Sequence, residues 1–142
     1  MDKSNRIGCV LGMLGSDVHT KGIRTVSRLL SDAGINVTFA GEHMSNEQMI
    51  AAIRAAKPEF VGFSFSTAGY LHSMRSFTQA LRDAGLADQV VVMVGGLVHP
   101  DDEDELREMG VTGLFGPGTT TQDILTWMNR IASEKTFSGA AQ

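Results

Sequence analysis

An aspartate and a histidine stand two residues apart near the amino end of the chain. Asp17 and His19 lie between Gly15 and Gly22, directly after the apolar run 7–14, in the pattern D-x-H-x-x-G. A histidine that binds a metal through one ring nitrogen usually donates its other N–H to a carboxylate. In an extended loop, residues two apart project to the same side. The pair therefore suits a metal-bound imidazole that an aspartate supports.

Two nucleotide-binding patterns and one signalling pattern do not fit this stretch. The dinucleotide fingerprint G-x-G-x-x-G fails because Gly12 and Gly15 are wrongly spaced, and the P-loop fails because Lys21 precedes Gly22. A phospho-receiver domain would need an acidic cluster after the first strand and an aspartate after the third, where Ser64 stands instead. The stretch is therefore not predicted to bind a phosphate group.

One histidine does not make a site for a free metal ion. Zinc needs three or four protein ligands, and no cluster of His, Cys or Glu at ligand spacing accompanies His19. The metal would have to arrive inside a cofactor that supplies the remaining ligands. If no such cofactor binds, we expect His19 to be a solvated loop residue and Asp17 to cap the following helix.

The elements that must position these residues follow from the hydrophobic pattern. Short apolar runs rich in β-branched or aromatic residues predict five buried strands, at 7–14, 35–40, 60–65, 90–94 and 111–115. Amphipathic stretches between and after them predict five helices. This alternation predicts an α/β fold, a flavodoxin-like doubly wound sheet of five parallel strands with helices on both faces. A single domain is expected over 1–133, with a disordered tail at 134–142.

Signals for helix ends agree with this pattern. Gly34, Gly85 and Gly110 occupy the positions of glycines that end helices, and 45–48 and 119–122 have the spacing of capping boxes.

The predicted sheet gathers the polar loops along one edge. Ligands of open parallel sheets bind beyond the carboxyl ends of the strands, which here are followed by the loops 15–22, 41–46, 64–71, 95–100 and 116–121. All four histidines of the chain lie in or beside these loops: His19, His43, His72 and His99. The edge is therefore the expected ligand site.

Composition excludes several classes of partner. The 142 residues carry a net charge of −4 and no dense Lys/Arg cluster, so neither nucleic acid nor an anionic membrane surface is expected. No apolar run reaches membrane-spanning length. The single cysteine, Cys9, lies inside the first apolar run and is expected to be a buried, inert thiol in a reducing cytoplasm.

Taken together, three motifs resemble a known family. They are D-x-H-x-x-G after the first strand, a serine after the third and Gly-Gly after the fourth, matched here by Asp17, His19, Gly22, Ser64, Gly95 and Gly96. The set is similar to the cobalamin-binding domain that holds its cofactor base-off, with a histidine on cobalt. The segment 115–119 resembles the last strand-to-helix turn of the mutase members, so the likeness extends from about residue 7 to about residue 131.

The resemblance implies a binding role for a set of residues at this edge. They are Ser16, Asp17, His19, Thr20, Gly22, Ser64, Ser66, Gly69, Gly95, Gly96, Gly116, Gly118 and Thr119. His19 would be the lower axial ligand of cobalt, and Asp17 would tune it. The glycines would line a slot for the dimethylbenzimidazole tail, to which Ser64 would donate a hydrogen bond. Where the family has S-x-L this chain has Ser66, which implies either a looser slot or another residue, Phe65 or Met93, in the place of the leucine.

The resemblance also implies a function. A domain of this kind would bind adenosylcobalamin and present it to a larger TIM-barrel subunit, as the small subunit of a split carbon-skeleton mutase that is inactive alone. Ser16 before Asp17 resembles glutamate mutase, which we favour, whereas 115–119 resembles acyl-CoA mutases of the methylmalonyl or isobutyryl type. No catalytic residue is expected in this chain. The alternatives are a corrinoid methyl carrier of a methyltransferase system and a non-enzymatic cobalamin sensor or storage module.

Overall fold

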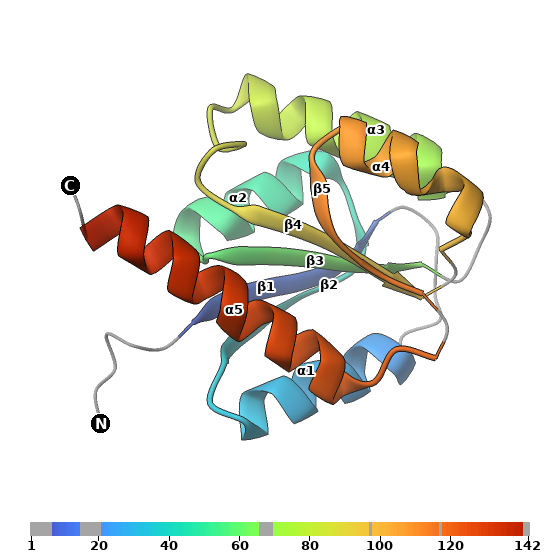
Figure 1. Ribbon diagram of the computed structural model, residues 1–142. Helices are drawn as coiled ribbons and strands as arrows, with labels where there is room; N and C mark the ends of the chain where they lie inside the picture. The colour runs from blue at the N-terminus through green and yellow to red at the C-terminus, as the bar shows by residue number, and fades with distance from the viewer. Residues whose placement is uncertain (1–6, 15–20, 66–69, 97, 117, 141–142) are drawn as a thin grey trace.

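The computed structural model describes residues 7–14, 21–65, 70–96, 98–116 and 118–140 (Figure 1). The strands are β1 (Gly8–Leu14), β2 (Asn36–Met44), β3 (Phe60–Phe65), β4 (Val91–Gly96) and β5 (Val111–Phe115). The helices are α1 (Lys21–Asp32), α2 (Asn46–Ala56), α3 (Tyr70–Asp83), the 3-10 turn η2 (Pro100–Asp102), α4 (Glu103–Glu108) and α5 (Thr121–Ala140).

The strands form one parallel sheet in the order β2-β1-β3-β4-β5. Helices α1 and α5 lie together on one face, and α2, α3 and α4 cover the other (Figure 1). This order and layering are those of flavodoxin-like folds. The predicted fold class is therefore confirmed.

Each face of the sheet has its own hydrophobic core, because alternate strand residues point to opposite sides. In β1, Leu11 and Met13 pack toward α1 and α5, whereas Val10 packs toward α2 and α3. In β3, Phe60 belongs to the core that faces α1 and α5, and Phe63 belongs to the core that faces α2 and α3. These runs are apolar at nearly every position because both faces of the sheet are covered.

Three predicted loops begin too early, because β2, β3 and β4 continue to Met44, Phe65 and Gly96. The sequence places a loop at 41–46, but β2 continues to Met44, whose partner in β1 is Leu14 across an irregular register. Backbone pairing extends this strand beyond its apolar run. Helix α5 is assigned from Thr121 to Ala140, and the disordered tail expected at 134–142 stays a prediction.

The helix-end signals are mostly confirmed. Ser45 and Gln48 form the predicted capping box of α2, and the three predicted helix-ending glycines all have positive φ. At α5 the reciprocal bonds join Thr120 and Asp123 rather than the predicted pair 119 and 122. The aspartate carboxylate accepts from the backbone N–H as the predicted glutamine would have done.

Cys9 lies in the core between the sheet and the helices α1 and α5. Cys9 is 1% exposed, as predicted, and burial raises the pKa of its thiol to about 12. The thiolate is therefore scarce at neutral pH, which makes the group inert. Within the described residues, no helix combines the length and apolar character needed to cross a membrane.

Candidate functional site

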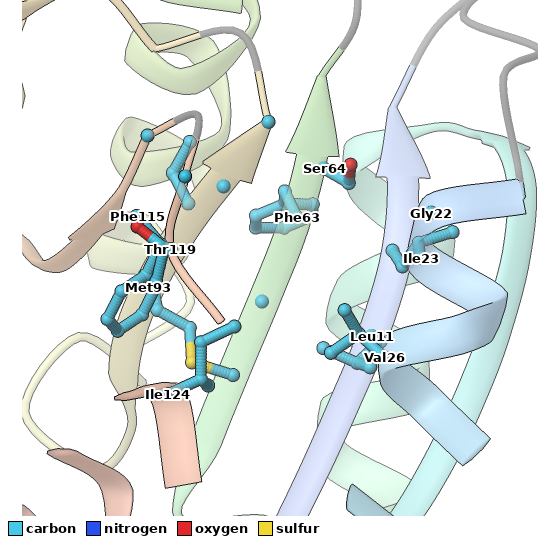
Figure 2. Close-up of a pocket in the computed structure, with 16 residues that line it drawn as sticks. Leu11, Gly22, Ile23, Val26, Phe63, Ser64, Met93, Phe115, Thr119 and Ile124 are labelled. Atoms are coloured by element: carbon cyan, nitrogen blue, oxygen red, sulfur yellow. The ribbon is translucent and has the colours of Figure 1, made fainter. Parts of the chain in front are cut away.

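A slot of about 270 Å³ lies between the sheet and the two helices α1 and α5 (Figure 2). It runs from the middle of the strands, at Leu11 and Met93, to their carboxyl ends, at Gly96 and Gly116. Ile23 and Val26 of α1 form one wall, as Figure 2 shows. The slot therefore lies at the edge where open parallel sheets bind their ligands.

The slot exists because small residues face α1 and α5 on the two central strands. Gly62 and Ser64 of β3 and Gly95 of β4 present little or no side chain to this face of the sheet. Larger residues at these positions would fill the space between sheet and helices. The hollow is therefore built into the strand sequences themselves.

The inner end of the slot is closed by two flexible side chains that fold over Gly62. A Cβ atom at Gly62 would lie 2.7 Å from Cδ2 of Leu11 and 3.0 Å from Cε of Met93. Met93, one of the two residues named as possible replacements for the family's leucine, therefore lines the inner end of the slot. Phe65, the other residue expected there, packs in the opposite core and does not line the slot, because it points to the other face of β3.

The mouth of the slot is formed by backbone that passes close to other backbone. Gly96 has φ +96°, and a Cβ atom there would lie 2.3 Å from the carbonyl oxygen of Phe65. On the other wall, a Cβ atom at Gly116 would lie 3.5 Å from the carbonyl oxygen of Val98. The position of Gly96 therefore accepts only glycine, for reasons of both conformation and space.

The lining is chemically simple. Among the described lining residues, the side-chain polar atoms are the hydroxyls of Ser64 and Thr119, and none is charged. The volume lies near the lower end of the roughly 300–1,000 Å³ of small-molecule sites. The slot therefore suits a small, mostly apolar group that makes few hydrogen bonds, and it is too small for a macrocycle.

The structure brings together seven of the predicted site residues. All seven line the slot: Gly22, Ser64, Gly95, Gly96, Gly116, Gly118 and Thr119. The other six lie outside the described residues: Ser16, Asp17, His19, Thr20, Ser66 and Gly69. The stretch 15–20 connects β1 to α1, and both of these elements contribute to the slot.

Sequence reasoning missed the apolar part of the lining. Leu11, Ile23, Val26, Gly62 and Ile124 were not singled out, yet they shape the slot. Only Gly62 carried a signal, because a glycine inside an apolar strand marks a close approach of backbone or ligand. The apolar side chains look like ordinary core residues until the sheet is assembled.

The remaining histidines lie outside the slot. His43 ends β2 beside Glu42, with 3.8 Å between Nε2 and the carboxylate. His72 is exposed on α3. Nδ1 of His99 accepts a hydrogen bond of 3.1 Å from the backbone N–H of Asp101. All three side chains are near strand ends or the helices that follow them, as expected, and none lines the slot.

A comparison with models of protein families identifies the domain to which these elements belong. The model of the B12 binding domain matches residues 7–126. The chain belongs to the B12-binding domain family. The matched range includes every element that lines the slot, from β1 to the beginning of α5.

Relatives of this B12-binding domain are mutases. An ethylmalonyl-CoA mutase from Methylorubrum extorquens is 31% identical over 120 residues, 82% of this chain and 17% of the relative. The small subunit of 2-hydroxyisobutanoyl-CoA mutase from Aquincola tertiaricarbonis is 27% identical over 119 residues, 84% of this chain and 87% of that subunit. The chain spans about a sixth of the length of the first curated relatives it matches.

A solved structure agrees with this assignment. The crystal structure of a cobalamin-binding protein from Desulfitobacterium hafniense superposes with a TM-score of 0.76 at 25% identity, covering 89% of this chain and 59% of that one. The protein is thus a cobalamin-binding domain related to the B12 domains of acyl-CoA mutases.

Proposed function

We propose that this domain holds cobalamin base-off, with the nucleotide tail of the cofactor in the slot and His19 as the lower axial ligand of cobalt. The observation that carries the proposal is the slot itself. Seven residues predicted from the motifs line one apolar cavity whose size and chemistry suit a benzimidazole base. The D-x-H-x-x-G stretch joins two elements that form this cavity.

The residues of the slot would hold the tail in distinct ways. The hydroxyl of Ser64 would donate a hydrogen bond to it, and the glycines at the mouth would let the backbone approach a bulky group. Leu11, Met93 and Ile124 would contact its apolar atoms. Burial of a flat apolar group here would remove its surface from water, which is the main favourable contribution to binding.

The D-x-H-x-x-G stretch would supply the bond to cobalt. One imidazole nitrogen of His19 would bind the metal, and the other would donate its N–H to the carboxylate of Asp17, which fixes the tautomer and raises the basicity of the ring. Ser16, Thr20, Ser66 and Gly69 would surround the cofactor. When bound as adenosylcobalamin, the cofactor supplies radical chemistry, and the protein contributes binding, orientation and exclusion of side reactions.

We further propose that the domain is the small subunit of an adenosylcobalamin-dependent acyl-CoA mutase and presents the cofactor to a larger TIM-barrel subunit. A small-subunit relative of nearly the same length supports this assembly. The mutase relatives favour an acyl-CoA substrate over the glutamate mutase type that Ser16 suggests. The small subunit alone would then be inactive.

The first experiment is a spectroscopic titration of the purified protein with cobalamin. The wild type is expected to give the base-off spectrum with histidine bound, and His19→Ala is expected to lose it. His43→Ala is the matched control, since His43 is exposed at the end of β2 and outside the slot. An unchanged spectrum in the His19 variant would contradict the axial assignment.

A second experiment tests the assembly. The domain would be mixed with the large subunit of an acyl-CoA mutase and with the large subunit of glutamate mutase, and each pair assayed on its own substrate. We expect activity only when the domain is paired with the large subunit of the acyl-CoA mutase. Activity only with glutamate, methyl transfer to an acceptor, or cobalamin binding without any mutase activity would favour glutamate mutase, the methyl carrier or the sensor, respectively.

A further inference from the structure

The single tyrosine of the chain connects the mouth of the slot to the opposite core. Tyr70 begins α3, is 4% exposed, and packs its ring against Phe65 with 5.9 Å between ring centroids. Its hydroxyl donates a hydrogen bond to the carboxylate of Asp102 and accepts one of 3.0 Å from the backbone N–H of His99. One hydroxyl thus joins His99, which caps η2, to Asp102, the last residue of η2.

The side chain of Asp102 does not cap the helix at whose start it stands. Asp102 stands at the N-cap of α4, where an aspartate usually accepts from a backbone N–H of the helix, yet its side chain makes no such bond. It accepts from Tyr70 instead. The turn η2 is capped separately by His99, whose Nδ1 accepts from the backbone of Asp101. The bond to Tyr70 therefore holds this turn against α3 rather than completing a helix.

The hydrogen bond to His99 fixes a backbone segment that ends at the slot. The N–H of Val98 donates to the carbonyl oxygen of Gly96 at 2.9 Å, so Val98 is held close to Gly96. The carbonyl of Val98 faces Gly116 across the mouth, at 3.5 Å from the position of a Cβ atom there. We refer to Gly96, Val98 and His99 as the mouth turn. A shift of His99 would be transmitted to both walls of the slot.

We propose that Tyr70 is a positioning residue of the cobalamin site, whose hydroxyl holds the mouth turn and thereby sets the width of the slot from the other side of the sheet. The inference rests on the proposed function in one respect, that the slot receives the nucleotide tail. Tyr70 itself does not line the slot. Its effect on the cofactor would be transmitted through Val98 and Gly96.

The test compares Tyr70→Phe with the wild type in binding two corrinoids, cobalamin and cobinamide, which lacks the nucleotide tail. The variant keeps the ring and its contact with Phe65 and removes only the hydroxyl. Loss of a hydrogen bond to a charged group is expected to weaken cobalamin binding about tenfold. Cobinamide binding should remain within about twofold, because it does not use the slot.

The matched control is Thr78→Val on the same helix. Thr78 is 3% exposed and its hydroxyl bonds the carbonyl of Arg75 within α3, remote from the mouth turn. This variant removes a buried hydroxyl and should leave both affinities unchanged. Asp102→Ala removes the same hydrogen bond from the other side. Its effect on cobalamin affinity should therefore not add to that of Tyr70→Phe.

A measurement without cofactor separates this inference from the proposed function. In the unliganded protein, amide hydrogen exchange at His99 should be faster in Tyr70→Phe than in the wild type and unchanged in Thr78→Val. Unchanged exchange, equal weakening of both corrinoids, or a loss matched by Thr78→Val would overturn the role of Tyr70. Failure of the wild type to bind cobalamin would overturn the proposed function, while the exchange result would still test the turn.

Discussion

At the scale of single residues, Tyr70 can be observed directly, because it is the only tyrosine of the chain. Burial, and then the hydrogen bond to Asp102, raise its pKa above the ordinary value, although the His99 N–H acts in the opposite direction. The folded state thus favours the protonated hydroxyl. Its contribution to the free energy of unfolding is present below about pH 10 and is lost as pH rises through the folded pKa.

Alkaline titration followed by tyrosinate absorbance should therefore give a midpoint above that of the same protein in denaturant. Asp102→Asn should lower the midpoint only in part, since burial is the larger cause. Circular dichroism at each pH establishes that the chain is still folded. Equal midpoints in the folded and the denatured protein would contradict the buried hydrogen bond.

The positions of residues at the slot could be predicted where a local sequence motif indicated them. Ser64, Gly95 and Gly96 lie at the carboxyl ends of β3 and β4 in a recognisable pattern, and the structure brings them to one slot. Tyr70 could not be found in this way. Its partners are 29 and 32 residues distant in sequence, and their meeting depends on how α3 packs beside η2.

At the scale of elements, the slot depends on the absence of a side chain at Gly62 of β3. An alanine at Gly62 would crowd the side chains of Leu11 and Met93, both of which line the slot. Overpacking of this kind typically costs about 1–3 kcal/mol. Gly62→Ala should therefore weaken cobalamin binding about tenfold and leave cobinamide binding unchanged, as measured by spectroscopic titration.

Gly12→Ala provides the control for this prediction. A Cβ atom at Gly12 would lie 2.6 Å from the sulfur of Met49, so the crowding is similar, but it occurs in the core on the other face of the sheet. This variant should lower the melting temperature without changing cobalamin affinity. Equal affinities of the two variants would show that Gly62 has no special relation to the slot.

Element positions were predictable where burial determines them and less so at their ends. The runs at 60–65 and 111–115 coincide with β3 and β5. For the central strand β3 the reason is that both of its faces are covered, so nearly every residue is buried. The end of β2 depends instead on pairing with β1, across an irregular register.

At the scale of the whole molecule, fold and function were indicated by different parts of the sequence. The alternation of strands and helices predicted the doubly wound sheet, but such a sheet serves many unrelated functions. The cofactor was indicated by residues that follow β1 and by residues at the carboxyl ends of β3 and β4, and the topology of the sheet places these strand ends at one edge. The apolar inner end of the slot emerges from the packing of α1 and α5 on the sheet and had no motif of its own.

The central claim is that a histidine of this protein, and not the base of the cofactor, binds cobalt. Electron paramagnetic resonance of the cob(II)alamin complex tests it most directly, because the axial nitrogen nucleus splits the cobalt lines. In protein labelled with ¹⁵N-histidine and loaded with unlabelled cofactor, we predict doublets, and their loss in His19→Ala. Triplets from ¹⁴N in the labelled protein would show that the cofactor's own base is bound and would contradict the account.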